Sequence, residues 1–287
     1  MYNVIYYRII VYLAACVTYN LVLAVAGKLF KGSKLTNEVA KQYGKVAILI
    51  PAYKEDEVIV STVLSYKKLN YPADKYEVIV IADSLQQETI NTLSEMDARV
   101  LEVSFEKSTK AKSLNVAFGK LGDDFDMVLI SDADNVLAPD FLTKANLLYQ
   151  KGHWAIQGQR VAKNLDTPFA ILDAANEIIA NHIYRKGANA LGLSSSVIGS
   201  GMVFHYPLIK EVLQGIQATG GFDKVLQLLI VERGISIKYL EDAYIYDEKI
   251  SHSAVFENQR KRWVSSQIVY LRTYWTKGWK ALFHGKL

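Results

Sequence analysis

Three aspartates stand at the ends of apolar segments and are the side chains best suited to hold a metal ion. Asp83 ends the run 76–82, and Asp132 and Asp134 follow the run 126–131 with one residue between them. Carboxylate oxygens suit Mg²⁺ or Mn²⁺, and either ion also binds the oxygens of a diphosphate. Two aspartates at this spacing also cap ordinary turns, and the spacing alone leaves both interpretations open.

Two lysines lie where a helix is expected to begin. Lys110 and Lys112 come directly before or at the start of the helical pattern 112–121. Cations near a helix N-terminus suit an anion such as a diphosphate. A solvated basic loop is the alternative for these two residues taken alone.

Two further segments combine residue types that bind phosphate or sugar. Gly199 and Gly201 flank Ser200 within an apolar run, where glycine marks either close approach of a ligand or a bulge. Further along, Gln259-Arg260-Lys261-Arg262-Trp263 combines amide and guanidinium donors with an indole. Arginine can clamp a phosphate and tryptophan offers a face to a sugar ring, although a basic helix face would have the same composition.

Alternating strands and helices are needed to position these side chains. Short apolar runs predict strands at 46–52, 76–82, 99–103 and 126–131, and helical spacing predicts helices at 57–69, 87–96 and 112–121. Fully apolar strands separated by helices indicate a mostly parallel sheet covered on both faces. Such folds bind ligands beyond the carboxyl ends of their strands, which is where the aspartates are expected.

The second half of the chain has a mixed pattern. It predicts strands at 154–161, 197–204 and 236–240 and helices at 169–184 and 225–233, the last closed by Gly234 as a C-cap.

Composition excludes several classes of protein. Hydrophobic residues make up 51% and charged residues 22% of the 287 residues, which argues against disorder. The net charge of +4 includes no dense basic tract, and we expect no nucleic-acid partner. The single cysteine, Cys16, cannot form an internal disulfide and fits a reducing compartment.

The N-terminus predicts a membrane anchor over residues 1–30. Residues 4–26 are mostly apolar and long enough to span a bilayer. Three lysines follow, Lys28, Lys31 and Lys34, and by the positive-inside rule they place the rest of the chain in the cytoplasm. A cleaved signal peptide and a buried helix are the alternatives. We expect a single-pass membrane protein with a linker at 31–44.

The C-terminal segment 264–287 alternates aromatic and basic residues. Trp275, Lys277, Trp279 and Lys280 suit the headgroup zone of a membrane, so an interfacial amphipathic helix is predicted. A helix packed on the domain surface is an equal alternative.

Taken in order, the segments above resemble the family-2 glycosyltransferases of the processive, membrane-bound type that includes cellulose synthase and hyaluronan synthase. The resemblance covers residues 45–263, and each piece is weak alone while the order is specific. The matching residues are Pro51, Ala52, Tyr53 and Glu55, then Asp83, Lys110, Asp132, Ala133 and Asp134, then Gly199, Ser200 and Gly201, and finally Gln259, Arg262 and Trp263.

The resemblance implies a GT-A fold, a Rossmann-like sheet flanked by helices, and a glycosyltransferase that moves a hexose. Asp83 would contact the nucleoside, Asp132 the nucleotide-sugar and Asp134 the Mg²⁺ or Mn²⁺ ion. Residues 51–55, Lys110 and Ala133 would complete the donor site. The Gly199–Gly201 segment and the Gln-x-x-Arg-Trp block would lie over the diphosphate and the acceptor.

The catalytic base is the point where this chain departs from the family pattern. Relatives have Thr-Glu-Asp ahead of a helix that ends near Arg-Gly, and counting back from Arg233 gives Asp223, with Phe222 replacing the glutamate. Asp223 as a helix N-cap is the alternative, and the pair Glu241-Asp242 is the second candidate for the base.

The implied function is inverting, metal-dependent transfer from a nucleotide-sugar, with a UDP-sugar favoured, to a saccharide or lipid-linked acceptor in polysaccharide biosynthesis. Asp83 is followed by Ser84 and Leu85, whereas many relatives have other residues after this aspartate. The resemblance therefore leaves open whether the base of the donor nucleotide is uracil or guanine. The altered Phe222 position motivates the alternative of an inactive nucleotide-sugar-binding scaffold of the same fold.

Overall fold

The computed structural model describes the backbone of residues 2–30, 35, 38–214, 216, 221–250 and 253–283. Within these ranges it does not describe the side chains of residues 2, 3, 253–256, 258, 259, 262, 281 and 282.

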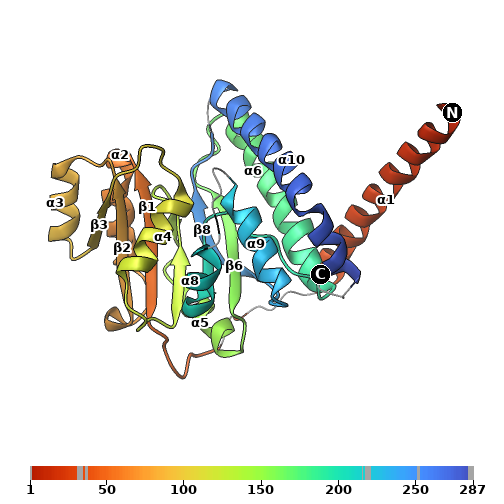
Figure 1. Cartoon of the computed structure of the whole chain (residues 1–287). Coiled ribbons are helices and arrows are strands. Elements are labelled where there is room, and N and C mark those ends of the chain that lie inside the picture. The colour runs from red at the N-terminus through yellow and green to blue at the C-terminus, as the bar shows by residue number, and fades with distance from the viewer. Residues whose placement is uncertain are drawn as a thin grey trace.

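Eight strands form one mixed sheet at the centre of the described chain (Figure 1). They are β1 (Val46–Tyr53), β2 (Tyr76–Asp83), β3 (Arg99–Val103), β4 (Met127–Ile130), β5 (Val136–Leu137), β6 (Ala155–Ala162), β7 (Met202–His205) and β8 (Lys238–Asp247). Their order across the sheet is β3-β2-β1-β4-β7-β6-β8-β5. The first four in that order pair in parallel, as do β6 and β8, whereas β7 runs antiparallel to both neighbours and β5 to β8.

Helices cover both faces of this sheet, and one helix extends away from it. They are α1 (Tyr2–Leu29), α2 (Asp56–Tyr66), η1 (Ala73–Lys75), α3 (Gln87–Glu95), α4 (Lys110–Lys120), α5 (Phe141–Gln150), α6 (Pro168–Ala180), the π-helix η2 (Asn181–Gly187), α7 (Ala188–Ala190), α8 (Tyr206–Gln214), α9 (Phe222–Glu232) and α10 (Ser253–Phe283). In Figure 1, α6 and α10 lie side by side, and α1 projects from the same end of the molecule.

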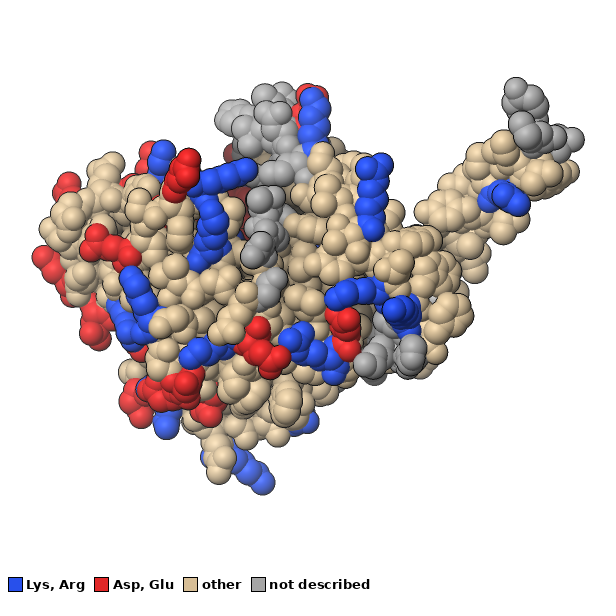
Figure 2. Space-filling model, in the orientation of Figure 1, with Lys and Arg blue, Asp and Glu red and all other residues tan. Residues whose placement is uncertain are grey.

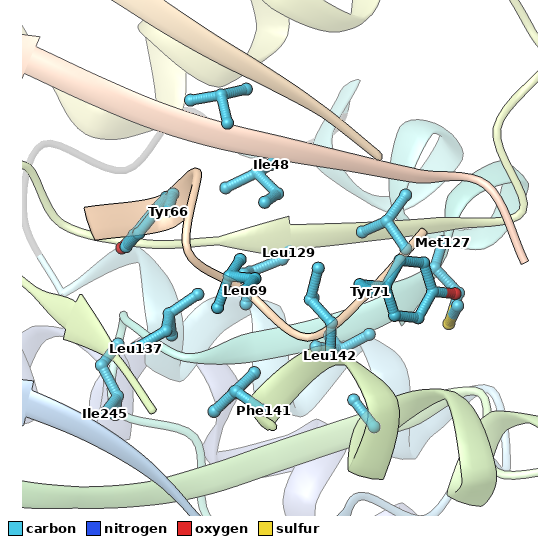
Figure 3. Close-up of a cluster of buried hydrophobic side chains, with 14 of the residues drawn as sticks. Ile48, Tyr66, Leu69, Tyr71, Met127, Leu129, Leu137, Phe141, Leu142 and Ile245 are labelled. Carbon is cyan, nitrogen blue, oxygen red and sulfur yellow. The ribbon is translucent and has the colours of Figure 1, made fainter. Parts of the chain in front are cut away.

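Alternation along the central strands divides the core into two layers. On β1, Ile48 and Ile50 pack with α2 and α5, while Ala47 and Leu49 pack with α4, α8 and α9. Figure 3 shows the first layer, where Ile48 points toward the side chains that α2 and α5 supply. Because successive side chains of a strand point to opposite faces, a run buried on both faces is apolar throughout.

The structure confirms the predicted α/β class and most of the predicted elements. Two predictions differ most in extent from the structure: the segment 197–201 is not a strand, and β8 continues seven residues past Leu240, to Asp247. Gly199 and Gly201 have φ of +85° and +63°, and this left-handed backbone breaks the predicted strand before Met202. Gly234 has φ +78° just past α9, as predicted for a C-cap.

Helix α1 is seated on the domain by close backbone contact with η2. His182 Nε2 lies 2.9 Å from the Ala24 carbonyl oxygen. A Cβ atom on Gly187 would lie 2.2 Å from the Leu23 carbonyl oxygen, so only glycine permits this approach. The stretch Val4–Leu29 is long and apolar enough to cross a membrane, and its outer part is exposed. Figure 2 shows α1 as largely uncharged.

Candidate active site

The carboxyl ends of β1, β2 and β4 meet at one edge of the sheet, where the sequence predicted the acidic residues. Tyr53 pairs with Asp83 at the ends of β1 and β2, and Asp132 follows the end of β4 by two residues. The Lys54 backbone N–H donates to the Asp83 carbonyl oxygen at 3.1 Å. This edge is the usual ligand-binding edge of an open α/β sheet.

The carboxylate of Asp83 is held by two hydroxyl groups. Ser84 Oγ donates to Oδ1 at 3.1 Å and Ser108 Oγ donates to Oδ2 at 2.5 Å. Asp83 as a whole is only 1% exposed.

Lys110 brings together three segments that are far apart in the sequence. Its ammonium group forms an ion pair with Asp132 Oδ1 and donates to the Gly199 carbonyl oxygen at 2.7 Å. The same Nζ lies 5.6 Å from the centre of the Phe222 ring, next to Asp223 in the chain. Lys110 is also the first residue of α4, whose N-cap Thr109 accepts from the Lys112 N–H at 3.3 Å. A cation at a helix N-terminus is a combination that suits an anion, although here Asp132 already balances the charge of Lys110.

Asp134 carries negative charge in an unfavourable place. Burial, followed by the nearby charges of Asp132 and Asp247, raises its pKa from 3.8 to about 6. Asp247 itself is buried, but Arg160 and Lys249 outweigh that effect and lower its pKa. Two carboxylates held together against their own repulsion are stabilised by a bound cation.

The carboxylates fit a divalent ion that is shared with a substrate. Among the described side chains, no group of three or more His, Cys, Asp and Glu could hold a metal alone. Mg²⁺ typically uses one or two carboxylates and takes its remaining ligands from phosphate oxygens and water. Asp132 and Asp134 match that donor set.

The predicted donor residues at the end of β1 differ in exposure. Tyr53 is 49% exposed, whereas Ala52 and Ala133 are buried in the core layer beneath the edge, so only their backbones can face a ligand. Pro51 is half-buried. Burial, then the charges of Asp132 and Glu57, raises the pKa of Glu55, which places this carboxylate beside the same acidic site.

The glycine segment has two separate roles. Gly199 supplies a carbonyl oxygen to Lys110, and a Cβ there would meet nothing within 4 Å. Ser200 is fully buried: its hydroxyl accepts from the Asp132 N–H at 3.0 Å and donates to Asn135 Oδ1 at 2.6 Å. Gly201 lies against Ile245, where a Cβ would be 2.9 Å from Cγ2. Ser200 therefore joins the backbone of the Asp-x-Asp loop to the side chain of Asn135 through hydrogen bonds.

Asp223 lies in the first turn of α9 and is not its N-cap, because Gly221 holds that position with φ +61°. Its carboxylate is 18% exposed and lies 3.5 Å from Lys224 Nζ. Helix α10 passes the same turn: a Cβ on Gly221 would lie 3.2 Å from Tyr270 Cε2. The capping alternative for Asp223 is thus wrong.

The pair Glu241-Asp242, the second candidate for the base, lies within β8. The sequence had instead predicted a strand that ends at residue 240, before the pair. Glu241 and Asp242 occupy a bulge, since Leu240 pairs with Gly158 and Tyr244 with Gln159. Glu241 forms an ion pair with Lys186 at 2.7 Å, and Asp242 Oδ2 lies 3.8 Å from Lys144 Nζ. These carboxylates face lysines of η2 and α5.

Helix α10 carries the Gln-x-x-Arg-Trp block alongside α6. Arg260 Nη2 donates to Asp173 Oδ1 at 2.7 Å, and its guanidinium carbon lies 4.7 Å from the centre of the Trp263 ring. Trp263 is half-buried. The side chains of Gln259 and Arg262 lie outside the described residues. The helix is continuous across residue 263, where the predicted domain boundary falls.

Sequence reasoning did not single out Ser108, Asn135 or Asp247. Asn135 directly follows the Asp-x-Asp pair, which is a usable signal. Asp247 is 112 residues further on, and its place beside Asn135 is visible only in the fold.

Comparison with known proteins identifies the relatives of this arrangement. A family model described as glycosyltransferase like family 2 matches residues 44–266. The probable glycosyltransferase YdaM of Bacillus subtilis is 25% identical over 250 residues, which are 82% of this chain and 58% of the relative. The chain thus spans a little over half the length of this curated relative.

Two groups of solved structures share the fold. A mannosyltransferase from Pyrobaculum calidifontis, in complex with GDP-Man and Mn²⁺, aligns with a TM-score of 0.59 at 18% identity, covering 83% of this chain and 67% of that one. Residues 1–349 of TarS from S. aureus, in complex with UDP-GlcNAc, align with a TM-score of 0.53 at 17% identity, covering 73% and 60%. The expected GT-A-like fold is confirmed.

Proposed function

The chain belongs to the glycosyltransferase like family 2, and we propose that it is an inverting, metal-dependent hexosyltransferase that uses a nucleotide-sugar donor. The observation that carries the proposal is the meeting of Lys110, Asp132, Gly199 and the start of α9 at one sheet edge. These are the segments whose order in the sequence resembles the family.

Asp134 is the residue we assign to the metal, and Asp132 the one we assign to the nucleotide-sugar. The raised pKa of Asp134 supports this, because a bound cation offsets the repulsion that raises it. Mg²⁺ or Mn²⁺ would neutralise charge on the departing diphosphate. The Pyrobaculum structure, which holds Mn²⁺ with GDP-Man, is consistent with this class of ligand.

Lys110 and the N-terminus of α4 are suited to hold the diphosphate. In the described structure the ammonium group balances Asp132, and a diphosphate arriving with its own cation would compete for that charge. Asp83 and Tyr53, at the ends of β2 and β1, would flank the nucleoside, with Glu55 beside the acidic site. A UDP-sugar is our first candidate donor and a GDP-sugar the second.

Asp223 is the base in this proposal. It would accept the proton of an acceptor hydroxyl as that oxygen bonds to the anomeric carbon. The bond from the anomeric carbon to the diphosphate oxygen breaks in the same step, and the configuration inverts. Trp263, Gln259 and Arg262 would lie over the acceptor, which we propose to be a saccharide or a lipid-linked saccharide used in polysaccharide biosynthesis.

The reaction would take place at the cytoplasmic face of a membrane. The candidate span Val4–Leu29 has 26 residues, and at about 1.5 Å per residue it exceeds a hydrocarbon core of roughly 30 Å. At the end of the molecule from which α1 projects, α6 exposes Ile171, Leu172 and Ile178, and α10 exposes Trp275 and Trp279. These side chains suit the bilayer interface, which supports an interfacial role for the C-terminal part of α10.

A non-catalytic nucleotide-sugar-binding scaffold is the second candidate, because Phe222 replaces the acidic residue before Asp223. Turnover of labelled UDP-sugars and GDP-sugars separates the two, with Asp134→Ala and Asp223→Asn as variants. Transfer that both variants lose supports the enzyme. Nucleotide binding without transfer or hydrolysis by the unmodified protein supports the scaffold, and undiminished turnover in both variants contradicts the assigned mechanism.

A further inference from the structure

A cluster of buried charged side chains lies next to the Asp-x-Asp loop. It is formed by Arg160 of β6, Glu177 of α6, Arg185 of η2, Asp247 at the end of β8, and Lys249. The side chains are 1–15% exposed. Desolvation of so many charges is expensive, and apolar packing often serves stability as well.

Each charge in the cluster has a partner. Arg160 contacts Glu177 Oε2 through both Nε, at 3.0 Å, and Nη2, at 2.5 Å. Arg185 Nη1 donates to Glu177 Oε1 at 2.8 Å. Lys249 Nζ lies 2.7 Å from Asp247 Oδ2, and Arg160 Nε lies 3.7 Å from the same oxygen. One oxygen of Asp247 is thus held by the cluster.

The other oxygen of Asp247 faces the metal loop through Asn135. The amide nitrogen of Asn135 donates to Asp247 Oδ1 at 3.0 Å and to Asp134 Oδ1 at 2.8 Å. Its amide oxygen accepts from Ser200 Oγ at 2.6 Å. Asn135 is fully buried, so all three bonds are made away from water. An aspartate at this position would offer no donor to either carboxylate.

We propose that Asp247 and Asn135 are positioning residues that fix the orientation of the metal-binding carboxylate Asp134. Asp247, clamped by Lys249 and Arg160, sets which way the Asn135 amide faces. Asn135 then holds one oxygen of Asp134 and leaves the rest of that carboxylate to a divalent cation. The inference rests on the proposed function, since it assigns the metal to Asp134. Hydrogen-bond partners of metal ligands typically change metal affinity about 10–100-fold when removed.

The test is the Kd of Mn²⁺ for the full chain in detergent with saturating UDP or GDP, read from the free Mn²⁺ signal in electron paramagnetic resonance. We expect Asn135→Ala to raise this Kd about 10–100-fold. With excess Mn²⁺, most of the kcat should return, as expected for a residue that acts through another. Asp247→Asn should also raise the Kd of Mn²⁺.

Asn189→Ala is the matched structural control. Asn189 also makes three hydrogen bonds, to the Tyr239 N–H and to the carbonyl oxygens of Leu193 and Ile237. Its loss should lower the melting temperature and leave the Mn²⁺ Kd within about twofold of the original, a shift of under roughly 0.4 kcal/mol. A Kd shift as large as that of Asn135→Ala would overturn the positioning role.

The double variant Asn135→Ala/Asp247→Asn tests the order of action. If Asp247 acts through Asn135, the double variant binds Mn²⁺ no more weakly than Asn135→Ala. If the two substitutions weaken Mn²⁺ binding additively, Asp247 does not act through Asn135 and the proposal is overturned. Unchanged Mn²⁺ affinity in Asn135→Ala also overturns it. If the unmodified protein binds no Mn²⁺ with either nucleotide, the proposed function fails and the relay with it. A different result is equal Mn²⁺ binding by the unmodified protein and Asn135→Ala, which overturns only the positioning role of Asn135 and Asp247.

Discussion

Asp134→Asn should stabilise the metal-free protein while it removes the metal ligand. The ionised carboxylate of Asp134 is half-buried near two other carboxylates, and its pKa rises from 3.8 to about 6. A carboxyl group whose folded-state pKa lies above its unfolded value destabilises the fold where it is ionised, at high pH. The penalty disappears as the pH falls through the folded and then the unfolded pKa.

The size of the effect follows from the shift. Two pKa units at 1.36 kcal/mol each give about 3 kcal/mol at pH 8, and the same two pKa values give about 1.5 kcal/mol at pH 5. Asparagine removes the charge but keeps the oxygen that accepts from Asn135. At roughly 2 °C for each kcal/mol in a chain of this size, the variant should melt about 6 °C higher at pH 8.

The assay is thermal unfolding of both proteins in detergent with EDTA at pH 8 and pH 5, so that no cation compensates the charge. Asp74→Asn, at an exposed position in η1, is the control and should have the same melting temperature as the original protein at both pH values. A variant that melts lower than the original at pH 8, or a difference that does not shrink toward pH 5, would refute the electrostatic account of the site.

Three other substitutions test other parts of the structure. Asp223→Asn should lower turnover about 10²–10⁴-fold and leave the donor Kd within twofold, measured by product formation and calorimetry. Lys110→Ala should weaken UDP or GDP binding about 10–100-fold, whereas Lys112→Ala, which loses a bond to the Lys107 carbonyl at 2.9 Å, should change it little. Gly187→Ala places a Cβ 2.2 Å from Leu23 O and should unseat α1, seen as faster proteolysis near residue 29; Gly119→Ala, with open space around its Cβ, is the control and should not. Unchanged UDP or GDP binding in Lys110→Ala would count against the assigned role of Lys110. An unchanged rate of proteolysis near residue 29 in Gly187→Ala would count against the seating of α1 on η2.

The first half of the fold could be predicted because its strands are buried on both faces. Segments such as 46–52 and 76–82 are apolar throughout, and only a sheet covered on both sides needs that pattern. Helix α8 was missed because Pro207 follows its first residue and looks like a breaker, although proline suits the first turn of a helix. The short strand β5 and helix α5 directly follow the Asp-x-Asp loop and were likewise not predicted.

The site could be predicted as an ordered set of segments but not as a set of contacts. Parallel pairing brings strand ends together, so the shared edge of Asp83 and Asp132 follows from the fold class. The ion pair of Lys110 with Asp132, and the hydrogen bond of Asn135 with Asp247, join residues 22 and 112 positions apart. Such pairs depend on tertiary packing and leave no period or spacing in a single sequence.

The most direct test of the account is Mn²⁺-dependent release of UDP or GDP from a panel of nucleotide-sugars by membranes that contain the protein. We expect release from at least one donor, its loss on chelation of the metal, and its absence from membranes that contain Asp134→Ala. Release that continues in EDTA, or that is equal in the Asp134→Ala membranes, would contradict the claim that these carboxylates hold a cation against the donor diphosphate.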